Sequence, residues 1–215
     1  EKIHSIRRPR PDDFQIKEAA VKIKNSKNPI IISGGGVFYS DAMEDVANFA
    51  TKHNIPVTQT VMGYSTMKKD HPYFLGPIGG LGGKAANNMA KKTDMAIAVG
   101  TKLGDFTTGS WSNFENPEFK LVSINVARFD ANKHMAQSVV GDAKVSLIEL
   151  SSALGNWKAP DEWYKKSRDE LKSWNEYVDK ESGPTNQKVP NYAHAVGAIY
   201  RKADPHDIVV TAAGG

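Results

Sequence analysis

The chain has 215 residues, of which 40% are hydrophobic, so it is long enough for one large domain with short additional segments. It contains no cysteine, which excludes disulfides, thiolate zinc sites and cysteine nucleophiles. Its 28 basic and 24 acidic residues are interspersed along most of the chain, so the formal net charge of +4 indicates an ordinary solvated surface.

No apolar run approaches the roughly 20 residues that span a bilayer, and the N-terminal residues lack the apolar core of a signal peptide. We therefore expect a cytoplasmic protein without a membrane partner. The one basic cluster, Arg7 to Arg10, is short, broken by proline and free of aromatic residues. We interpret residues 1–12 as an N-terminal linker and expect no nucleic-acid partner.

Apolar stretches alternate with amphipathic segments after this linker. The first predicted helix begins at Asp12 or Asp13, where a carboxylate can cap it. Further helices are predicted after Asp41, whose spacing to Glu44 resembles a capping box, around residues 85–90, and after Asp142. The predicted strands cover residues 30–33, 57–61, 95–99 and 120–126.

The segment from residue 64 to residue 82 is predicted to be a glycine-rich loop. We expect no strand in it, because HPYFLGP contains two prolines. Apolar strands that alternate with helices of about 12 residues imply parallel strands joined by right-handed crossovers. Residues 13–154 are therefore predicted to form one α/β domain, a doubly wound parallel sheet with helices on both faces.

The pattern changes beyond residue 154. Residues 155–189 are expected to form a helical connector, with a highly charged helix at residues 161–182. A helix from Tyr192 to Lys202 and a strand in DIVVTAAGG then mark residues 190–215 as the start of another domain. Because a domain seldom ends where a strand meets a glycine turn, we expect the chain to be a fragment of a longer protein.

Three consecutive glycines, Gly34, Gly35 and Gly36, follow the first predicted strand and precede a helix, as in a phosphate-binding turn. They fit only the first half of G-x-G-x-x-G, because the sixth position is Tyr39. The second strand is followed by TQTVMG, which offers no acid to a ribose hydroxyl. These departures disfavour an NAD site and indicate glycines that let the chain turn sharply at the edge of the sheet.

A second glycine segment, GPIGGLGGKAA, contains Gly80, Gly82 and Ala85 with the formal spacing of a dinucleotide turn. No strand is expected before it, but a helix that begins near Lys84, after Gly83, would present free amides to a diphosphate. Binding of a nucleotide diphosphate and close packing of the loop both remain open for this segment.

Residues for other chemistries do not form recognised sites. Asp105 and Asn132 resemble the magnesium-binding pair of diphosphate enzymes only superficially, since Phe106 stands where a glycine is expected. The six histidines lack metal-ligand spacing, and no serine lies in a G-x-S-x-G turn. We expect neither a metal site nor catalytic residues within this chain.

Several short motifs in a fixed order resemble the middle domain of thiamine-diphosphate-dependent enzymes of the acetolactate synthase type. They are NPIIISGGGV, HNIPVTQTVMGYSTM, HPYFLGPIGGLGG, KTDMAIAVGTKLGDF, LVSINV and VVGDAKVSLIEL. Within this family, GTKLGDFTTGSW, INVARFDANKH and DIVVTAAGG are most similar to the branch that hydrolyses a carbon–carbon bond of a cyclic diketone in inositol catabolism. The resemblance covers residues 13–154 and implies a Rossmann-like fold and hydrolase activity, with an acetolactate-forming enzyme as the alternative.

The resemblance also implies that the complete enzyme has three domains and uses thiamine diphosphate and magnesium. The first domain would supply a glutamate that activates the cofactor, and the third would supply the magnesium ligands, so this fragment alone would be inert. Ala213, Gly214 and Gly215 would approach the diphosphate at the start of the third domain. The implied partners are a small-molecule substrate, the other domains of the same polypeptide and, for the full-length enzyme, further copies in a homo-oligomer.

Flavin-carrying relatives bind FAD or ADP in this middle domain through glycine loops, an arginine and an acid. Here the arginine position holds Lys102, which lacks the planar two-pronged contact of arginine with phosphate, and INVARFD replaces the acidic turn. FAD and ADP are therefore disfavoured, and a regulatory module that binds either one remains the alternative of a different class. Residues 63–83 and 102–113 would line the entrance of the cofactor cavity, where hydroxyls such as those of Thr108 and Ser112 suit a hydroxyl-rich substrate.

Overall fold

The computed structural model describes residue 5, residues 7–204 and residues 206–210. The chain divides into two compact units, Glu1–Leu171 and Lys172–Gly215, and each is described by itself. Among the described helices, none combines the length and the apolar character that a membrane crossing requires.

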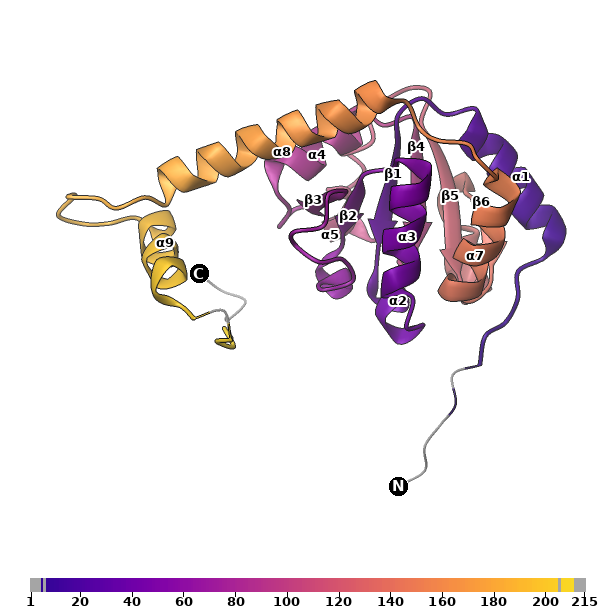
Figure 1. The fold of residues 1–215 in the computed structure, drawn as a ribbon, viewed down its shortest axis with the longest axis horizontal. Coiled ribbons are helices and arrows are strands. Elements are labelled where there is room, and N and C mark those ends of the chain that lie inside the picture. Colours follow the sequence, from indigo (N-terminus) through magenta and orange to yellow (C-terminus); the bar gives the residue numbers. More distant parts are fainter. Residues whose placement is uncertain (1–4, 6, 205, 211–215) are drawn as a thin grey trace. The chain divides into compact units, whose positions relative to one another are not determined.

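The first unit is built on a six-stranded sheet in the order β3-β2-β1-β4-β5-β6, and every neighbouring pair of strands is parallel (Figure 1). The strands are β1 (Pro29–Ser33), β2 (Val57–Gln59), β3 (Phe74–Pro77), β4 (Met95–Val99), β5 (Lys120–Asn125) and β6 (Gln137–Val140). The predicted doubly wound parallel sheet is thereby confirmed. Its order reverses between β1 and β4, which is where such folds place their crevice.

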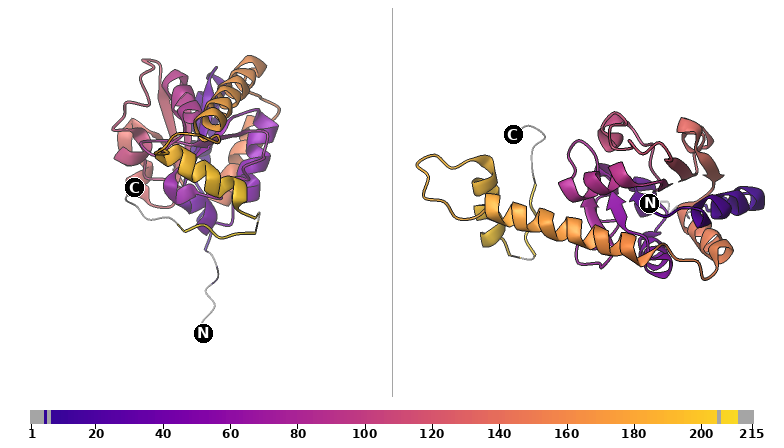
Figure 2. Two further views of the ribbon diagram at one scale, coloured as in Figure 1. Left: turned by 90° about the vertical axis from the view of Figure 1, so that its left-hand side faces the viewer. Right: turned by 90° about the horizontal axis from the view of Figure 1, so that it is seen from above.

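Helices cover both faces of the sheet, as the views in Figure 2 show. They are α1 (Asp13–Lys24), α2 (Gly35–Tyr39), α3 (Met43–His53), α4 (Lys84–Lys92), α5 (Asp105–Thr108), α6 (Arg128–Ala131) and α7 (Ala143–Leu154), with short 3-10 turns η1 (Val61–Gly63) and η2 (Lys133–Met135). The helices α1, α3 and α7 pack together on one face. Right-handed crossovers place α4, α5 and α6 on the other face, where α5 and α6 have only four residues each.

Burial on both faces explains the unbroken apolar strands. All five residues of β1 and all five of β4 are buried, which is typical of central parallel strands. On the face of α1, α3 and α7, the core includes Ile31, Ile97 and Val122 together with Leu147 of α7. Because side chains alternate along a strand, Leu121 of β5 faces the opposite side of the sheet from Val122.

The strand β3 corrects the prediction that residues 64–82 are a loop without a strand. The prolines did not exclude it, because Pro72 precedes the strand and Pro77 is its last residue at the edge of the sheet. The guanidinium of Arg168 covers this edge by donating hydrogen bonds to the carbonyls of Pro72 and Phe74. The guanidinium thus occupies backbone acceptors that an exposed edge strand would leave without a partner.

Three other local predictions also need correction. The strand β6 and the short helix α2 were not predicted, because four or five residues carry too little periodicity. The cap of α3 is Ala42 rather than Asp41, whose φ of 51° places it in the preceding turn. By contrast, Asp142 caps α7 as predicted and accepts a hydrogen bond from the amide of Val145.

The helix α8 (Asp161–Glu181) begins in the first unit and ends in the second, which also contains α9 (Tyr192–Lys202). Both helices were predicted. The capping box of α9 joins Asn191 and His194, and Arg201 donates a hydrogen bond to the carbonyl of Ser182. In the predicted terminal strand DIVVTAAGG, the described residues 207–210 form no strand, and residues 211–215 lie outside the described part.

Candidate functional site

The carboxyl ends of the six strands define the edge of the sheet at which a parallel α/β fold forms its site. The two glycine segments, residues 34–36 and residues 79–83, follow the parallel strands β1 and β3. They therefore lie at the same edge, as predicted. The loops after β2 and β4 contact them there, and the parallel strand β5 ends on the same side, so the parts of these five loops next to the strand ends make up the surface that we call the carboxyl edge.

The first glycine segment packs directly against neighbouring backbone. A side chain on Gly34 would place its Cβ 2.5 Å from the carbonyl oxygen of Gly100, and one on Gly36 would come within 2.7 Å of the Cα of Gly100. Gly35 is equally restricted by the carbonyl oxygen of Met62, at 2.9 Å. The amides of Gly34 and Gly36 donate to the carbonyls of Val99 and Gly100. This loop therefore holds β1 against β4, and two of its three amides donate hydrogen bonds within the protein.

The second glycine segment is likewise bonded to the protein. The amides of Gly82 and Gly83 donate to the carbonyls of Gly79 and Pro77, and the amide of Gly80 donates to Phe106. The side chain of Asn87 on α4 both accepts from the amide of Gly79 and donates to its carbonyl. The helix α4 begins at Lys84 as predicted, and Gly83 offers no side-chain cap. Four of the five amides of residues 79–83 are thus already bonded within the protein, whereas the amides of the first turn of α4 follow an uncapped helix start.

A cavity of about 280 Å³ lies at the carboxyl ends of the strands, where it is bounded by Gly36 after β1, Gly100 after β4, Asn125 at the end of β5 and Asp142 after β6. The N-terminal arm lies beside this cavity. Arg8 pairs with the carboxylate of Asp142 at 3.0 Å and donates to the carbonyl of Ser40 at 2.6 Å. The segment that was predicted to be a linker is therefore attached to the domain at this position.

The other predicted site residues are placed differently. Lys102 follows β4 at the same edge and its side chain is exposed. The hydroxyl of Thr108 is bonded to Gly104 and Trp111 within its own loop, and Ser112 donates to Gly109, so these hydroxyls serve local structure. Three predicted cofactor contacts lie outside the described residues: Ala213, Gly214 and Gly215.

Large apolar side chains are exposed along the carboxyl edge. Each of the loops after β1 to β5 contributes at least one, and the set is Phe38, Tyr39, Val61, Met62, Tyr64, Leu81, Phe106, Val126 and Phe129. Exposed apolar side chains that gather on one surface usually mark a contact with another protein surface or a ligand. This edge is therefore suited to packing against further polypeptide.

The histidines with a lowered pKa lie outside the two glycine segments of this edge. No group of three or more His, Asp or Glu side chains within the described part of the chain is arranged to hold a metal ion. Burial lowers the pKa of His53 and of His71, but these residues belong to α3 and to the segment before β3 rather than to the glycine loops. Since six of the eight amides of residues 34–36 and 79–83 are bonded within the protein and the described residues form no group of metal ligands, these residues do not by themselves fit thiamine diphosphate and magnesium.

Two residues of this edge carried no recognisable signal in the sequence. Arg8 lies in a proline-broken stretch and its partner Asp142 is 134 positions away. Asn87 is a polar residue on an amphipathic helix, and only its position next to Gly79 in space reveals its role. A long-range polar contact of this kind leaves no local pattern to read.

The fold and this edge define a Rossmann-like α/β domain whose strand-end loops form one surface. The chain belongs to the thiamine pyrophosphate enzymes, because the model of the central domain of that family matches residues 16–150.

Named relatives agree with this assignment. The chain is 46% identical over 153 residues to 3D-(3,5/4)-trihydroxycyclohexane-1,2-dione hydrolase of Clostridium perfringens, a match that covers 71% of this chain and 24% of the relative. It is 42% identical over 153 residues to 3D-(3,5/4)-trihydroxycyclohexane-1,2-dione hydrolase 1 of Bacillus cereus, again over 71% of this chain and 24% of the relative. The enzyme of that name from Clostridium botulinum is 40% identical over 179 residues, covering 83% of this chain and 28% of the relative. The matched region thus spans about a quarter of the length of these relatives.

Proposed function

We propose that this chain is the middle part of a thiamine-diphosphate-dependent hydrolase that opens the ring of trihydroxycyclohexane-1,2-dione to 5-deoxy-glucuronate in inositol catabolism. The observation that carries the proposal is the 46% identity over 153 residues to a hydrolase named for that substrate. The motifs of residues 100–111 and 124–134, which separate this branch from flavin-carrying relatives, lie within the same domain.

In this proposal the chain acts as a scaffold. The tight packing of Gly34 and Gly36 against the loop after β4, and of Gly35 against the turn after β2, supports a fixed carboxyl edge that faces a cavity built with neighbouring domains. Gly82, Gly83 and Lys102 belong to the same edge. Ala213, Gly214 and Gly215 are proposed to approach the diphosphate of the cofactor. The glutamate and the magnesium ligands would come from domains outside residues 13–154.

The domain organisation follows from the same proposal. Residues 1–12 connect to a preceding domain, residues 13–154 form the middle domain, residues 155–189 form the helical connector, and residues 190–215 begin the diphosphate-binding domain. We further propose that the full-length enzyme is a homo-oligomer.

An assay of the full-length enzyme tests the proposed substrate. Purified enzyme with thiamine diphosphate and magnesium receives either pyruvate or trihydroxycyclohexane-1,2-dione, and acetolactate and the ring-opened product are measured. We expect ring opening of the dione and no acetolactate. Acetolactate from pyruvate, with the dione untouched, would favour the alternative, a condensing enzyme of the acetolactate synthase type.

Calorimetry of the 215-residue chain tests its role as a scaffold. We expect no binding of thiamine diphosphate with magnesium tighter than about 10 μM, which corresponds to about 7 kcal/mol. The same experiment with ADP and FAD addresses the regulatory alternative. Tight binding of either nucleotide would show that the engaged amides of the glycine loops rearrange to accept a phosphate.

A further inference from the structure

A second hollow lies at the opposite end of the sheet, where β5 and β6 begin. The first residue of β6, Gln137, pairs with Val122, so Lys120 and Leu121 of β5 extend past the start of β6. The only α-helices described in the crossovers on either side of β5 are the four-residue α5 and α6, and the second crossover also contains the 3-10 turn η2. The missing strand pairing and the short helices leave a cavity of about 530 Å³, which we call the amino-end pocket.

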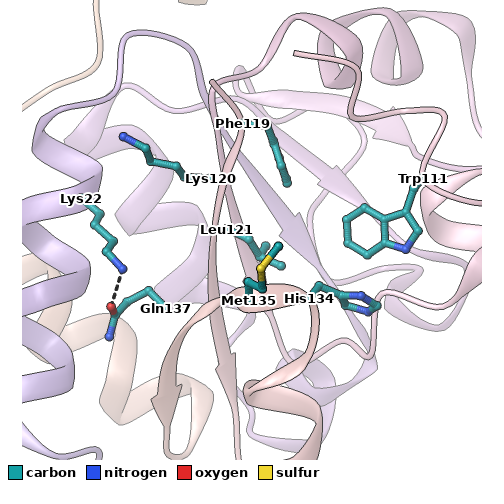
Figure 3. A pocket seen from close by; sticks show the side chains of 8 residues that line it. All are labelled: Lys22, Trp111, Phe119, Lys120, Leu121, His134, Met135 and Gln137. Atoms are coloured by element: carbon teal, nitrogen blue, oxygen red, sulfur yellow. Dashed lines mark hydrogen bonds between the residues drawn. The ribbon is translucent and has the colours of Figure 1, made fainter. Parts of the chain in front are cut away.

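The side chains around this pocket are arranged by chemical type (Figure 3). Lys22 and Lys120 lie at one end, next to α1, and Trp111 lies at the other end. Leu121 and Met135 lie between them. A volume of this size is within the range of about 300–1,000 Å³ that small-molecule sites occupy.

The aromatic end is built from strained backbone. The rings of Trp111 and His134 lie 4.3 Å apart between their centroids. Among the described non-glycine residues, eight have a positive φ, and four of these line or adjoin the pocket: Ser110 at 51°, Trp111 at 69°, His134 at 60° and Met135 at 54°. Residues held in this region of φ concentrate at functional sites, where the surroundings must enforce a particular shape. Packing of the side chain does not explain the positive φ of Met135, because this side chain is fully exposed.

The cationic end presents two ammonium groups. The amide of Gln137 donates to Glu18, which turns its oxygen toward the ammonium of Lys22 at 2.7 Å. The ammonium of Lys120 has no hydrogen-bond or ion-pair partner among the described residues. The adjoining carboxylate of Asp94 is already bonded to backbone amides. A positive charge is therefore free to meet an acid group.

We propose that the amino-end pocket binds a small aromatic carboxylate. The ring lies against Leu121, Met135 and the Trp111 end, and the carboxylate meets Lys120 and Lys22. The site lies at the amino ends of the strands, and Trp111 and His134 reach it from the far parts of the loops after β4 and β5, whose first parts belong to the carboxyl edge. Binding here is proposed in addition to the proposed catalytic function. The pocket recognises two features of the ligand, a flat apolar ring and a negative charge, and neither is sufficient for binding by itself.

The test uses 2-naphthoate as the probe and the 215-residue chain labelled with ¹⁵N. We expect saturable shifts of the Trp111 indole N–H signal, with a dissociation constant of about 1 mM or tighter for a ligand of this size. A Trp111→Phe variant assigns that signal. The neutral analogue 2-naphthamide should bind about 10-fold more weakly, because it has the ring without the charge.

Matched substitutions test the cationic end. Lys120→Glu should weaken binding of 2-naphthoate about 10-fold, whereas Lys17→Glu, the same charge change on the exposed surface of α1, should change it less than about 2-fold. Met135→Glu, at a fully exposed side chain, gives a second variant with no expected loss of folding. The amide spectrum of each variant confirms that it is folded.

Three results would overturn the proposal. They are an absence of saturable shifts at Trp111, equal binding of 2-naphthoate and 2-naphthamide, and an equal effect of the Lys120 and Lys17 variants. If the pocket instead accommodates an apolar side chain of another polypeptide segment, the charge of the probe is irrelevant, and 2-naphthoate and 2-naphthamide should bind equally.

Discussion

The two ends of the sheet are built in different ways. At the carboxyl edge, glycines bring loop backbones within van der Waals distance, and their amides bond to other loops. At the amino-end pocket, non-glycine residues such as Trp111 and Met135 take up the positive φ that glycine would adopt more easily. Positive φ at non-glycine residues is shared by both ends, since Ser65 and Leu103 of the carboxyl-edge loops have it too. The ends differ in that glycines remove the space between loops at the carboxyl edge, whereas the amino-end pocket stays open.

This difference separates two uses of backbone conformation. A glycine that lies against its neighbours makes an edge rigid, and a rigid edge suits a surface that must fit against other domains. A strained residue beside an open cavity lowers the stability of the folded chain, and such a cost is expected where a ligand requires a particular shape of the cavity. The predictions below test whether the two ends respond differently to the same kind of substitution.

The largest effect is expected at Gly100. Its φ is +61°, and a Cβ would lie 2.6 Å from the Cα of Gly36, so Gly100→Ala introduces both strain and a backbone clash. We expect the free energy of unfolding to fall by about 3–5 kcal/mol. Gly104→Ala in the same loop is the control, because no atom lies within 4 Å of its added Cβ and it should stay within about 0.5 kcal/mol of the parent. Denaturant unfolding of both variants checks the pair, and equal losses would contradict the packing argument.

The next largest effect concerns the attachment of the N-terminal arm to the carboxyl edge. The carboxylate of Asp142 is 2% exposed, accepts from the amide of Val145 and pairs with Arg8. Asp142→Ala removes both contacts and should cost about 2–3 kcal/mol of unfolding free energy.

Asp142→Asn separates the two contributions. Asparagine is an equally good helix cap but carries no charge, so this variant should lose only about 1 kcal/mol. If alanine and asparagine cost the same, the cap contributes nothing and the interaction with Arg8 explains the whole effect. Both values come from urea unfolding at one pH.

The fold of the first unit was largely predictable because its signals are local. Central strands such as Met95–Val99 are continuous apolar runs, and α1 and α7 carry helical periodicity and capping carboxylates. The edge strands β3 and β6 were missed, since a short edge strand needs no continuous apolar run and tolerates proline at its ends. Sequence periodicity identifies helices of several turns and strands that are buried along their length. It fails for short edge strands, because pairing with a single neighbouring strand determines whether they form.

The candidate site was predictable only in part. Strand polarity placed both glycine loops at one edge, because parallel strands end on the same side. The sequence could not show that Gly34 and Gly36 lie against Gly100, since that contact joins positions more than 60 residues apart. The amino-end pocket was not predicted at all, because it arises from a difference in length between two neighbouring strands and from positive φ values at residues with ordinary side chains.

A smaller effect, which depends on pH, is expected on the helical face between the two ends. His53 is buried, and its ring nitrogens contact the carbonyl of Trp157 at 2.8 Å and the hydroxyl of Ser151 at 2.9 Å. Burial is the main cause that lowers the pKa of His53 from 6.5, with Lys52 and Lys158 adding to it. Below pH 6.5 the unfolded chain therefore takes up this proton more readily than the folded chain.

The free energy of unfolding should consequently decrease as the pH falls below 6.5, and the His53 contribution is fully present above that value. His53→Gln should cost about 1–2 kcal/mol at neutral pH, through its lost hydrogen bonds, and should show a weaker loss on acidification. Urea unfolding at several pH values gives both quantities. His71 and His134 also have a lowered pKa, so only the difference between parent and variant reports on His53. Parallel pH profiles for the two proteins would contradict the assignment.

The smallest effect compares two exposed methionines, one at each end of the sheet. Met62 at the carboxyl edge is 74% exposed and lies in a 3-10 turn, whereas Met135 at the amino-end pocket is 100% exposed and has a φ of 54°. Glycine at Met62 should lower the free energy of unfolding by about 0.5–1 kcal/mol, because it adds freedom to the unfolded chain. Glycine at Met135 has the same cost but also relieves a left-handed conformation worth about 1–2 kcal/mol, so it should leave stability unchanged or raise it. Denaturant midpoints of the two variants measure the difference, and equal losses would mean that Met135 is not strained. If Met135→Gly stabilises the chain while weakening 2-naphthoate binding, the strain at this end is maintained for the shape of the pocket.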